Sequence, residues 1–462
     1  MSAAQPKPVI PKATAFRASV TTPGSKSLTN RAMLLAALAD EATTLTAPLT
    51  AQDTEVMATA LLSLGILLEI HDRDDGTGEW ERLTIHGIGS DRRLQGNVTL
   101  DLCNAGTATR FLTAAAGVCA DSPVTIDGNP RMRQRPIAVL ANALTHLGAT
   151  IEYLDQPDHL PLRIHPASTI KRAAHLPCTQ SSQFISALLM IAPCLPDGLT
   201  LTLDPPVTSA SYVGMTLSLM ERFGARFEVE GPLTTISVAP GGYTSPGTFA
   251  IEPDASSATY FLAAAAVIPE SVCTIENLGR GSLQPDAGFA DVLAQMGAGL
   301  TFGSDFITVL GPKAGLTGID IDMAHMPDAA MTLAVTALFA KGETVIRGLA
   351  TLQHKETDRL HALKTELAKF GANVEIEDNE ILVIEPPTSP DAPLFDNSVP
   401  IEVDTYDDHR MAMAFAVAAA ARGNVIIRDP DCVNKTYPTF WHDFLSALDR
   451  RQPSSPGPSP RI

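Results

Sequence analysis

The sequence predicts an α/β protein built from one small unit of strands and helices that is repeated six times. Six segments share one pattern: each begins with small or polar residues and continues into an Ala-, Leu- and Met-rich helical stretch. These segments start at Lys26, Asn104, Ser181, Asp254, Asp328 and Asp407. The starts lie about 73 to 79 residues apart, which is longer than the period of a simple solenoid repeat. A period of this length suits a compact unit with its own strands.

The segments between these helices supply the other elements of the unit. Strand-like runs occupy residues 98–102, 199–203, 344–346 and 425–427. Second helices that each end in a glycine are predicted at 58–65, 137–148, 216–224, 289–297 and 360–371, and each glycine suits a helix C-terminus. Short alternating strands follow at 149–153 and 372–376. The unit therefore reads strand, helix, strand, helix, strand.

The openings of the six helices carry Ser, Thr, Asn and Asp, which are preferred residues at helix N-caps. Asp254 and Asp407 are expected to be such caps. Helix N-termini present unpaired N–H groups and a positive dipole end. If the six N-termini converge, they would form a space that suits an anionic ligand.

The composition indicates a compact enzyme of two or three domains. The chain has 462 residues, of which 45% are hydrophobic and 18% charged. Its net charge of −18 argues against nucleic acid or an anionic membrane as a partner. A small anionic ligand remains compatible, because a cleft can be locally basic on an acidic protein.

The six cysteines do not form C-x-x-C pairs or zinc-like clusters with histidine, so we expect reduced, mostly buried thiols. The first residues lack the apolar region of a secretory signal, and no apolar run is long enough to span a bilayer convincingly. A cytoplasmic protein is expected. The Pro- and Ser-rich residues 449–462 are expected to be a disordered tail.

Lysine and arginine are scarce, and several lie at helix starts or in loops beside Gly and Pro. They are Lys26, Arg31, Arg110, Arg131, Arg133, Arg135, Lys355, Arg359, Arg410 and Lys435. Phosphates and carboxylates are held best by several charge-assisted hydrogen bonds, and arginine can donate two in parallel. A ligand with several anionic groups could use most of this set. Arg131 and Arg133, in the loop at 130–136, are the members expected to be ordinary surface residues.

Two carboxylates are candidates for proton transfer. Asp328 follows Met326-Pro327 at a predicted helix start, and Glu356 lies between Lys355 and Arg359. Nearby cations favour the charged form of a carboxylate, which suits a catalytic base or acid. A structural helix cap explains Asp328 almost as well on local evidence.

The motifs, taken in order, closely resemble one family. PGSKSLTNRAML, NAGTATRFL, GNPRMRQRPI, SSQFISALLM, MPDAAMTLAVTALFAKGET, KETDRL and DDHRMAMAFA occur between about residues 23 and 438. The chain resembles 5-enolpyruvylshikimate-3-phosphate synthase, which catalyses enolpyruvyl transfer in aromatic amino acid biosynthesis, the shikimate pathway that leads to chorismate. Each motif is weak by itself, whereas the ordered set is specific.

The resemblance implies a two-domain enolpyruvyl transferase architecture, in which each domain has three βαβαββ repeats arranged as an inverted barrel. The active site would lie in the interdomain cleft. Domain one would comprise residues 1–22 and 249–448, and domain two residues 23–248. A monomer is expected.

The resemblance also implies the ligands of both substrates. Shikimate 3-phosphate would contact Lys26, Ser27, Arg31, Ser181, Ser182, Gln183, Ser209, Tyr212, Asp328, Thr351 and Lys355. Phosphoenolpyruvate would contact Lys26, Gly106, Arg135, Gln183, Arg359, Arg410 and Lys435. Glycine at 106 would let the backbone approach the ligand closely.

The implied reaction needs two proton transfers and no metal or organic cofactor. The 5-hydroxyl of shikimate 3-phosphate would lose a proton as it attacks C2 of phosphoenolpyruvate, and C3 would gain one. The resulting tetrahedral intermediate would then lose phosphate. Asp328 is the candidate for the hydroxyl proton, and Glu356 and Lys26 are candidates for the proton at C3. Closure of the domains would exclude water.

The sequence departs from the family pattern at two positions: Thr351 replaces a frequent Asn, and Phe111 replaces a frequent Pro. Two alternatives remain open. The UDP-N-acetylglucosamine enolpyruvyl transferase shares the fold, but it is expected to have Lys-Asn where this chain has Lys26-Ser27, and a cysteine in the loop at 130–136. A non-catalytic anion-binding protein would be expected to lack Asp328 and Glu356.

Overall fold

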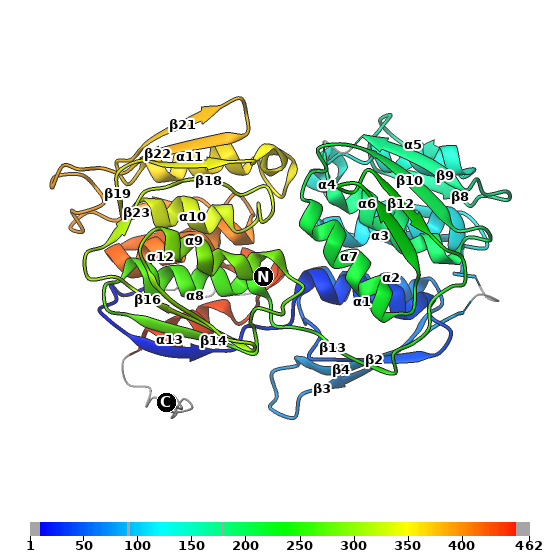
Figure 1. Cartoon of the computed structure of the whole chain (residues 1–462), viewed down its shortest axis with the longest axis horizontal. Coiled ribbons are helices and arrows are strands. Elements are labelled where there is room, and N and C mark those ends of the chain that lie inside the picture. Colours follow the sequence, from blue (N-terminus) through cyan, green and yellow to red (C-terminus); the bar gives the residue numbers. More distant parts are fainter. Residues whose placement is uncertain (1–9, 90–92, 178–179, 450–462) are drawn as a thin grey trace, which may run out of the picture. The chain divides into compact units, whose positions relative to one another are not determined.

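The computed structural model describes residues 10–89, 93–177 and 180–449. The chain forms two compact units (Figure 1): unit 1 is Met1–Pro23 with Pro253–Ile462, and unit 2 is Gly24–Glu252. Strand β13 (Thr248–Ala250) spans the domain boundary expected at 248/249 and pairs with β2 (Ala42–Thr46) in unit 2. Cys178 and, except for Asp449, the expected tail lie outside the described residues.

Five four-stranded sheets share one plan. In each, a strand that follows a buried helix pairs with a parallel strand, and a second helix is followed by an antiparallel pair of strands. In four of the sheets the order across the sheet is first, second, fourth, third along the chain, whereas in the fifth the last strand of unit 2 takes the first place. The plan contains the predicted strand–helix–strand–helix–strand unit and adds a fourth strand that the sequence pattern did not reveal.

Unit 2 contains three of these sheets. Their orders are β13-β2-β4-β3, β5-β6-β8-β7 and β11-β12-β10-β9. The strands not yet defined are β3 (Leu67–Asp72), β4 (Trp80–His86), β5 (Val98–Asp101), β6 (Val124–Asp127), β7 (Thr150–Tyr153), β8 (Leu162–His165), β9 (Ala173–Pro177), β10 (Leu199–Asp204), β11 (Phe227–Glu230) and β12 (Thr235–Val238). The helices are α1 (Lys26–Leu38), α2 (Gln52–Ser63), α3 (Gly106–Cys119), α4 (Pro130–Gln134), α5 (Ala138–Leu147), α6 (Ser182–Ile191), η1 (Ala192–Cys194) and α7 (Ala210–Arg222).

Unit 1 contains the sheets β1-β14-β16-β15 and β18-β20-β22-β21, with two shorter pairs, β17-β19 and β23-β24. The strands are β1 (Arg17–Val20), β14 (Val272–Glu276), β15 (Gly299–Phe302), β16 (Phe306–Leu310), β17 (Leu316–Thr317), β18 (Asp320–Asp322), β19 (Ala340–Lys341), β20 (Thr344–Arg347), β21 (Asn373–Glu377), β22 (Ile381–Glu385), β23 (Ile401–Val403) and β24 (Val425–Ile427). The helices are α8 (Ala255–Val267), η2 (Pro285–Gly288), α9 (Phe289–Gln295), α10 (Ala330–Ala337), η3 (Ala350–His354), α11 (Arg359–Ala368), α12 (His409–Arg422), η4 (Pro430–Lys435) and α13 (Phe440–Leu448). The sixth repeat is thus reduced, among the described residues, to a parallel pair with its helices.

The Ala-rich helices form the centre of each unit. Every residue of α3 is buried, as are nearly all residues of α8 and α12. These helices are apolar on every side, and only the interior of a core removes all of that apolar surface from water. The outer strands alternate instead, as β14 and β16 do with buried and part-buried residues, which is typical of a sheet with one covered face. In unit 1 the sheets lie on opposite sides of the central helices (Figure 1).

The predicted helix ends are confirmed more closely than the helix starts. Gly65, Gly148, Gly224, Gly297 and Gly371 all follow or cap a helix with positive φ. Two second helices begin earlier than predicted, at Gln52 instead of 58 and at Ala210 instead of 216. Their first turns carry polar residues, which the apolar pattern did not include.

The predicted caps are confirmed in part. Asp254 caps α8 by accepting from Ser257 N at 2.7 Å. The expectation for Asp407 is wrong: Asp408 caps α12, and Asp407 precedes it with φ of 55°. The loop expected at 130–136 contains α4, which Asn129 caps.

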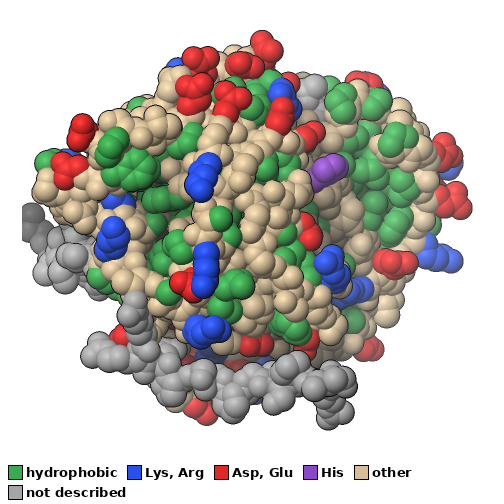
Figure 2. All heavy atoms as spheres, turned by 60° about the vertical axis from the view of Figure 1, so that its left-hand side comes forward, with side chains coloured by type: hydrophobic (Ala, Val, Ile, Leu, Met, Phe, Trp, Pro, Cys, Tyr) green, Lys and Arg blue, Asp and Glu red, His purple; other side chains and the backbone are tan. Residues whose placement is uncertain are grey.

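Acidic side chains gather on the outside of the molecule. On the face drawn in Figure 2, Asp and Glu cluster at the top, the side of unit 1 that carries β21 and β22. The net charge of −18 therefore resides at least partly on the surface. Within the three described ranges, no helix combines the length and the apolar character needed to cross a bilayer.

Candidate functional site

In unit 1, Arg359 organises a buried group of charged side chains. It is the first residue of α11, and its side chain is 1% exposed. Its guanidinium donates to both carboxylate oxygens of Asp408, at 2.7 and 3.2 Å, and to Glu356 at 2.9 Å. Burial by itself lowers the pKa of Arg359, but the carboxylates of Asp408, Glu356 and Asp328 outweigh it and leave the pKa raised. The guanidinium is therefore a permanent, rigid cation.

Asp328 lies where three cations meet. Its two carboxylate oxygens accept from Arg359 and from Arg410, each at 3.0 Å, and Lys355 Nζ lies 3.4 Å away. Helix α10 begins only at Ala330, and its N-cap is Ala329. The structure therefore gives Asp328 a place among cations rather than the role of a helix cap, which local evidence had left open.

Lys435 and Glu356 complete this group, with Lys435 Nζ 3.9 Å from Glu356 Oε1. We call the set the unit 1 charge cluster; its members are Asp328, Lys355, Glu356, Arg359, Asp408, Arg410 and Lys435. It contains four cations and three carboxylates. A surplus of positive charge in a partly buried place favours an anionic ligand.

In unit 2, Arg31 is a buried cation with neutral partners. It is 2% exposed, and it donates to Thr216 Oγ1 at 2.8 Å, to the Ser27 carbonyl at 3.0 Å and to Ser186 Oγ at 3.4 Å. Its guanidinium lies 5.2 Å from the ring centre of Phe111. Among the described residues it pairs with no carboxylate. Burial lowers the pKa of Arg31 to about 10, and Tyr212 offsets only part of this effect.

Lys26 begins α1, and its Nζ lies 3.3 Å from Asp53 Oδ2 at the start of α2. The two side chains are 13% and 5% exposed. Ser25 caps the helix, so Lys26 and Ser27 occupy its first turn, where the backbone N–H groups point outward along the axis. Asp53 therefore fixes a cation beside a helix N-terminus.

Gly106 and Arg135 are in close contact. A Cβ atom at position 106 would lie 2.7 to 2.9 Å from three atoms of the Arg135 guanidinium. Arg135 is 5% exposed, and its Nη1 donates to Asn104 Oδ1 at 3.4 Å. Glycine is therefore required at the start of α3 for the guanidinium to lie against the backbone.

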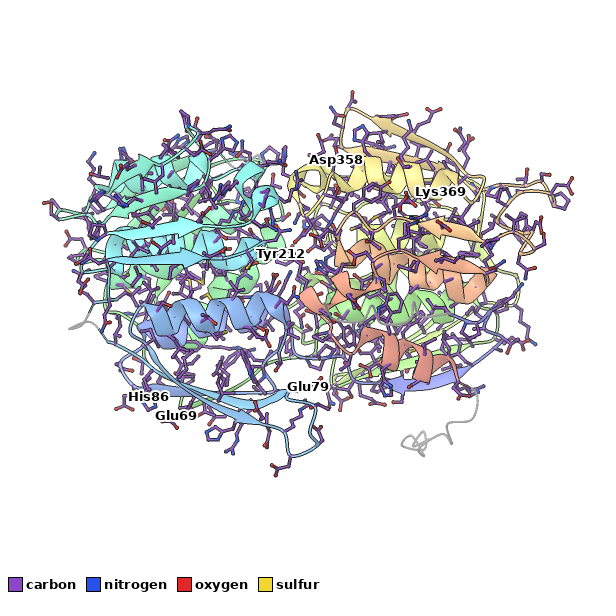
Figure 3. The ribbon with its side chains drawn as sticks, turned by 180° about the vertical axis from the view of Figure 1, so that it is seen from behind. Glu69, Glu79, His86, Tyr212, Asp358 and Lys369 are labelled. Atoms are coloured by element: carbon purple, nitrogen blue, oxygen red, sulfur yellow. The ribbon has the colours of Figure 1, made fainter. Side chains whose placement is uncertain are left out.

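The remaining residues expected in unit 2 lie at the starts of α6 and α7. Ser181 caps α6, and Gln183 Nε2 donates to Thr107 Oγ1 of α3 at 3.3 Å. Ser209 precedes α7 in a left-handed conformation, with φ of 51°. Tyr212 projects from the first turn of α7 (Figure 3). The contacts of Arg31, Gln183 and Phe111 show that α1, α3 and α6 meet near their N-terminal ends.

Thr351 occupies the position where relatives frequently carry Asn. It lies in η3, is 5% exposed, and its hydroxyl has no hydrogen-bond partner among the described residues. A buried hydroxyl without a partner is costly unless a ligand or water satisfies it. The shorter Thr side chain thus keeps a polar group at this position.

Of the two arginines expected to be surface residues, Arg133 is exposed and Arg131 is half-buried. Arg133 pairs with Asp127 at the surface through bonds of 2.9 and 2.7 Å, and Arg131 Nη1 lies 3.4 Å from Gln134 Oε1. Arg110 is buried and donates to the Pro136 carbonyl at 2.8 Å. The contacts of Arg110, Arg131 and Arg133 are thus with protein groups of their own segment or its neighbours, which gives these arginines a structural role.

Sequence reasoning missed the residues that hold the candidate side chains. Asp53 lies beside Lys26, Thr216 and Ser186 hold Arg31, and Tyr260 accepts from Arg410 at 3.4 Å. These residues lie on other helices, tens to hundreds of positions away along the chain. A clue existed for Asp408 alone, which lies two residues before Arg410 in the motif DDHRMAMAFA.

Residues 10–444 match the family model described as EPSP synthase (3-phosphoshikimate 1-carboxyvinyltransferase). The chain is 43% identical over 433 residues to the 3-phosphoshikimate 1-carboxyvinyltransferase of Pasteurella multocida, covering 92% of this chain and 94% of that protein. It is 42% identical over 434 residues to the protein of the same name from Shewanella denitrificans, covering 92% and 95%.

Solved structures show the same fold. An EPSP synthase from Acinetobacter baumannii superposes with a TM-score of 0.76 at 24% identity, covering 95% of this chain and 97% of that one. The enolpyruvyl transferase NikO from Streptomyces tendae superposes with a TM-score of 0.72 at 18% identity, covering 96% and 97%. The architecture of repeated small mixed sheets is thus that of the enolpyruvyl transferases.

Proposed function

This chain belongs to the EPSP synthase (3-phosphoshikimate 1-carboxyvinyltransferase) family. We propose that the two groups of residues described above, one in each unit, bind its substrates and carry out the reaction. The chain is a transferase of the shikimate pathway of aromatic amino acid biosynthesis. It moves the carboxyvinyl group of phosphoenolpyruvate to shikimate 3-phosphate. The proposal concerns how the residues divide this work, and it includes an active site in a cleft between two three-repeat domains.

The residues of unit 2 hold shikimate 3-phosphate in this proposal. Arg31 supports the assignment, because its buried charge has neutral partners among the described residues and an anionic group would compensate it. Ser181, Ser182 and Gln183 lie at the N-terminus of α6, where a phosphate can accept from backbone N–H groups. Lys26, Ser27, Ser209 and Tyr212 complete the set, with Asp328, Thr351 and Lys355 contributed by unit 1.

The cations of the unit 1 charge cluster hold phosphoenolpyruvate. Arg359, Arg410 and Lys435 carry the charge, and Arg359 is kept rigid by Asp408 and Glu356. Lys26, Gly106, Arg135 and Gln183 contribute from unit 2. Fixed cations around a phosphate and a carboxylate stabilise the charge that moves during addition and elimination.

Asp328 takes the proton of the 5-hydroxyl in this proposal. Before substrate enters, hydrogen bonds from Arg359 and Arg410 satisfy this carboxylate, and such a carboxylate is a weak base. The anionic groups of phosphoenolpyruvate compete for the same guanidinium groups. Binding of that substrate would therefore release Asp328 to accept a proton as the hydroxyl attacks C2.

Glu356 and Lys26 are the candidates for protonating C3. Glu356 is 8% exposed and pairs with Arg359 at 2.9 Å, whereas Lys26 pairs with Asp53 at 3.3 Å. Lys26 as an ammonium carries a proton before substrate binds, whereas Glu356 is ionised beside Arg359 and would take one up only once phosphoenolpyruvate competes for that guanidinium. Either group would recover its proton from C3 when phosphate leaves. The proton that Asp328 took from the hydroxyl leaves with the phosphate, so addition followed by elimination balances without another reactant.

The observation that carries the proposal is the gathering of Asp328, Glu356, Arg359 and Arg410 from three separate segments. The test measures release of inorganic phosphate from both substrates together, with the wild-type chain and with Asp328→Ala, Glu356→Gln and Lys26→Ala. We expect each substitution to lower kcat by about 10²- to 10⁴-fold, the range of acid–base groups.

Matched controls are Asp320→Ala and Lys313→Ala, which remove one exposed carboxylate and one exposed amine from surface ion pairs. Both should keep wild-type kcat. Unchanged turnover in Asp328→Ala would remove its assigned role. Phosphate release with UDP-N-acetylglucosamine in place of shikimate 3-phosphate would contradict the assignment of the acceptor site.

A further inference from the structure

Unit 2 has a cavity at the end of its central helices that lies away from the candidate site. It has a volume of about 330 Å³ and is lined by the C-terminal end of α1, the last residue of α3 and η1. Cys119 and Cys194 both line it, with Arg93 beside them. Because α3 has 14 residues, its two ends lie about 20 Å apart. The mechanism uses none of these groups.

The two thiols line the same cavity. Cys119 ends α3 and is buried, whereas Cys194 follows α6 and is partly exposed. A hydrogen bond with Cys119 and burial both raise the pKa of Cys194 well above its usual value, and Arg93 acts weakly in the other direction. Cys273, by contrast, is buried in the core of unit 1, where burial alone raises its pKa to about 12.

Backbone hydrogen bonds hold both cysteine segments against the cavity. Leu94 N donates to the Cys119 carbonyl at 2.9 Å, and Arg93 Nη1 donates to the Val118 carbonyl at 2.6 Å. On the other side, Gly242 N donates to the Pro193 carbonyl at 2.8 Å. These bonds fix the backbone on both sides of the cavity that the two thiols line.

We propose that Cys119 and Cys194 form a modification site that reacts with small-molecule disulfides and closes to an intramolecular disulfide. The partly exposed Cys194 attacks first, as a thiolate, and displaces one thiol from the small disulfide. Cys119 then loses its proton and attacks the Cys194 sulfur of the mixed disulfide, which releases the second thiol. Two protein thiols are oxidised, and one small disulfide is reduced to two thiols.

The bond would join the C-terminal ends of the helices whose N-terminal ends carry Gly106 and Gln183. It would close a loop of the chain between residues 119 and 194, so it restricts the unfolded chain and raises the unfolding temperature by several degrees. Because thiolate is the attacking species, the rate should rise about tenfold per pH unit from pH 7 to 9.

The test incubates the purified full chain with oxidised glutathione, followed by alkylation, proteolysis and mass spectrometry. We expect one cross-linked peptide pair containing Cys119 and Cys194, the loss of two titratable thiols, and full reversal by dithiothreitol. Cys194→Ser should abolish the cross-link, and Cys119→Ser should stop at a glutathione adduct on Cys194. Cys273→Ser is the matched control and should leave the cross-link unchanged.

The result in the wild-type chain decides the proposal even if a variant folds poorly. Adducts on exposed Cys103 without any cross-link would overturn it. A cross-link from Cys119 or Cys194 to Cys178 would overturn it equally, and the Cys178→Ser variant distinguishes that outcome. A cross-linked protein with an unchanged unfolding temperature would refute the expected effect on the helices.

Discussion

At the scale of single residues, the buried cations of the two groups are satisfied in different ways. Arg359 is surrounded by carboxylates, which raise its pKa against the effect of burial. Arg31 has hydroxyl, carbonyl and aromatic partners, and burial lowers its pKa to about 10. In the first arrangement the protein's own carboxylates compensate the buried charge, whereas the second leaves a charge for a ligand to compensate.

Replacing Arg31 should therefore affect binding far more than folding. Arg31→Gln should weaken binding of shikimate 3-phosphate about 10- to 100-fold, the loss of one or more charge-assisted hydrogen bonds. The free energy of unfolding should stay the same or increase, because a desolvated charge is removed. Calorimetric titration and urea denaturation measure the two effects. Arg347→Gln, which removes an exposed arginine paired with Asp320, should change neither; lost stability with unchanged affinity would refute the assignment.

The lowered pKa of Arg31 also predicts a pH dependence of binding. The charge on Arg31 is present below pH 10 and is lost as the pH rises through about 10 in the absence of ligand. The affinity for shikimate 3-phosphate should then fall by up to about tenfold per pH unit above that point. Affinities measured from pH 8 to 11 give the curve. Arg31→Lys should shift its fall to lower pH, and identical curves would exclude Arg31 as the titrating group.

Gly106 offers a test of the contact with Arg135. In Gly106→Ala, the new Cβ would lie within 2.9 Å of the guanidinium, so the flexible Arg135 side chain must move. We expect the KM for phosphoenolpyruvate to rise roughly tenfold or more, since one charge-assisted contact is displaced. The fold should persist. Gly214→Ala, where nothing lies within 4 Å, is the control in a helix, and equal effects of the two substitutions would contradict the explanation.

At the scale of elements, the repeat was readable because the helices have two distinct kinds of sequence. The Ala-rich helices such as α8 are buried on every side, and their partners such as α11 end at glycines with positive φ. Asp358 and Lys369 mark the two ends of α11 (Figure 3). The antiparallel strands were harder to predict, because β3 and β11 have few buried residues and no clear alternation.

The glycine that caps α5 should be indispensable. Gly148 has φ of 121°, and a Cβ there would lie 2.2 Å from the Thr169 carbonyl oxygen. At Gly297, φ is 105° and nothing lies within 4 Å of such a Cβ. An alanine there therefore shows the cost of backbone strain alone, without a steric clash. Gly297→Ala should cost about 1–2 kcal/mol, and Gly148→Ala about 3 kcal/mol or more. Urea denaturation measures both, and equal losses would show that the carbonyl contact is unimportant.

At the scale of the whole molecule, the chain passes from unit 1 into unit 2 and back. Strand β1 pairs with β14 in unit 1 before the chain enters unit 2, and β13 completes a unit 2 sheet before the return. Each unit is therefore built from residues far apart in sequence. The candidate residues are divided between the units in the same way.

This division predicts that substrate binding brings the two units closer together. In the proposed function, shikimate 3-phosphate contacts Arg31 of unit 2 and Asp328 and Lys355 of unit 1, so binding should reduce the radius of gyration measured by X-ray scattering. Arg31→Gln should show no reduction at the same ligand concentration. An unchanged radius at saturation of the wild-type chain would contradict closure. The expected monomeric state and cytoplasmic location remain predictions.

The sequence by itself determined the class of fold, the six-fold repeat and the ordered motifs, because helix periodicity, glycine ends and charged residues at helix starts are local properties. Only the tertiary structure decided that Asp408 rather than Asp407 caps α12, that Asp328 meets Arg359 and Arg410, and that Asp53 lies beside Lys26. Such contacts join segments that are far apart in the chain. The partners of a charged side chain are therefore known only once folding has placed these segments together.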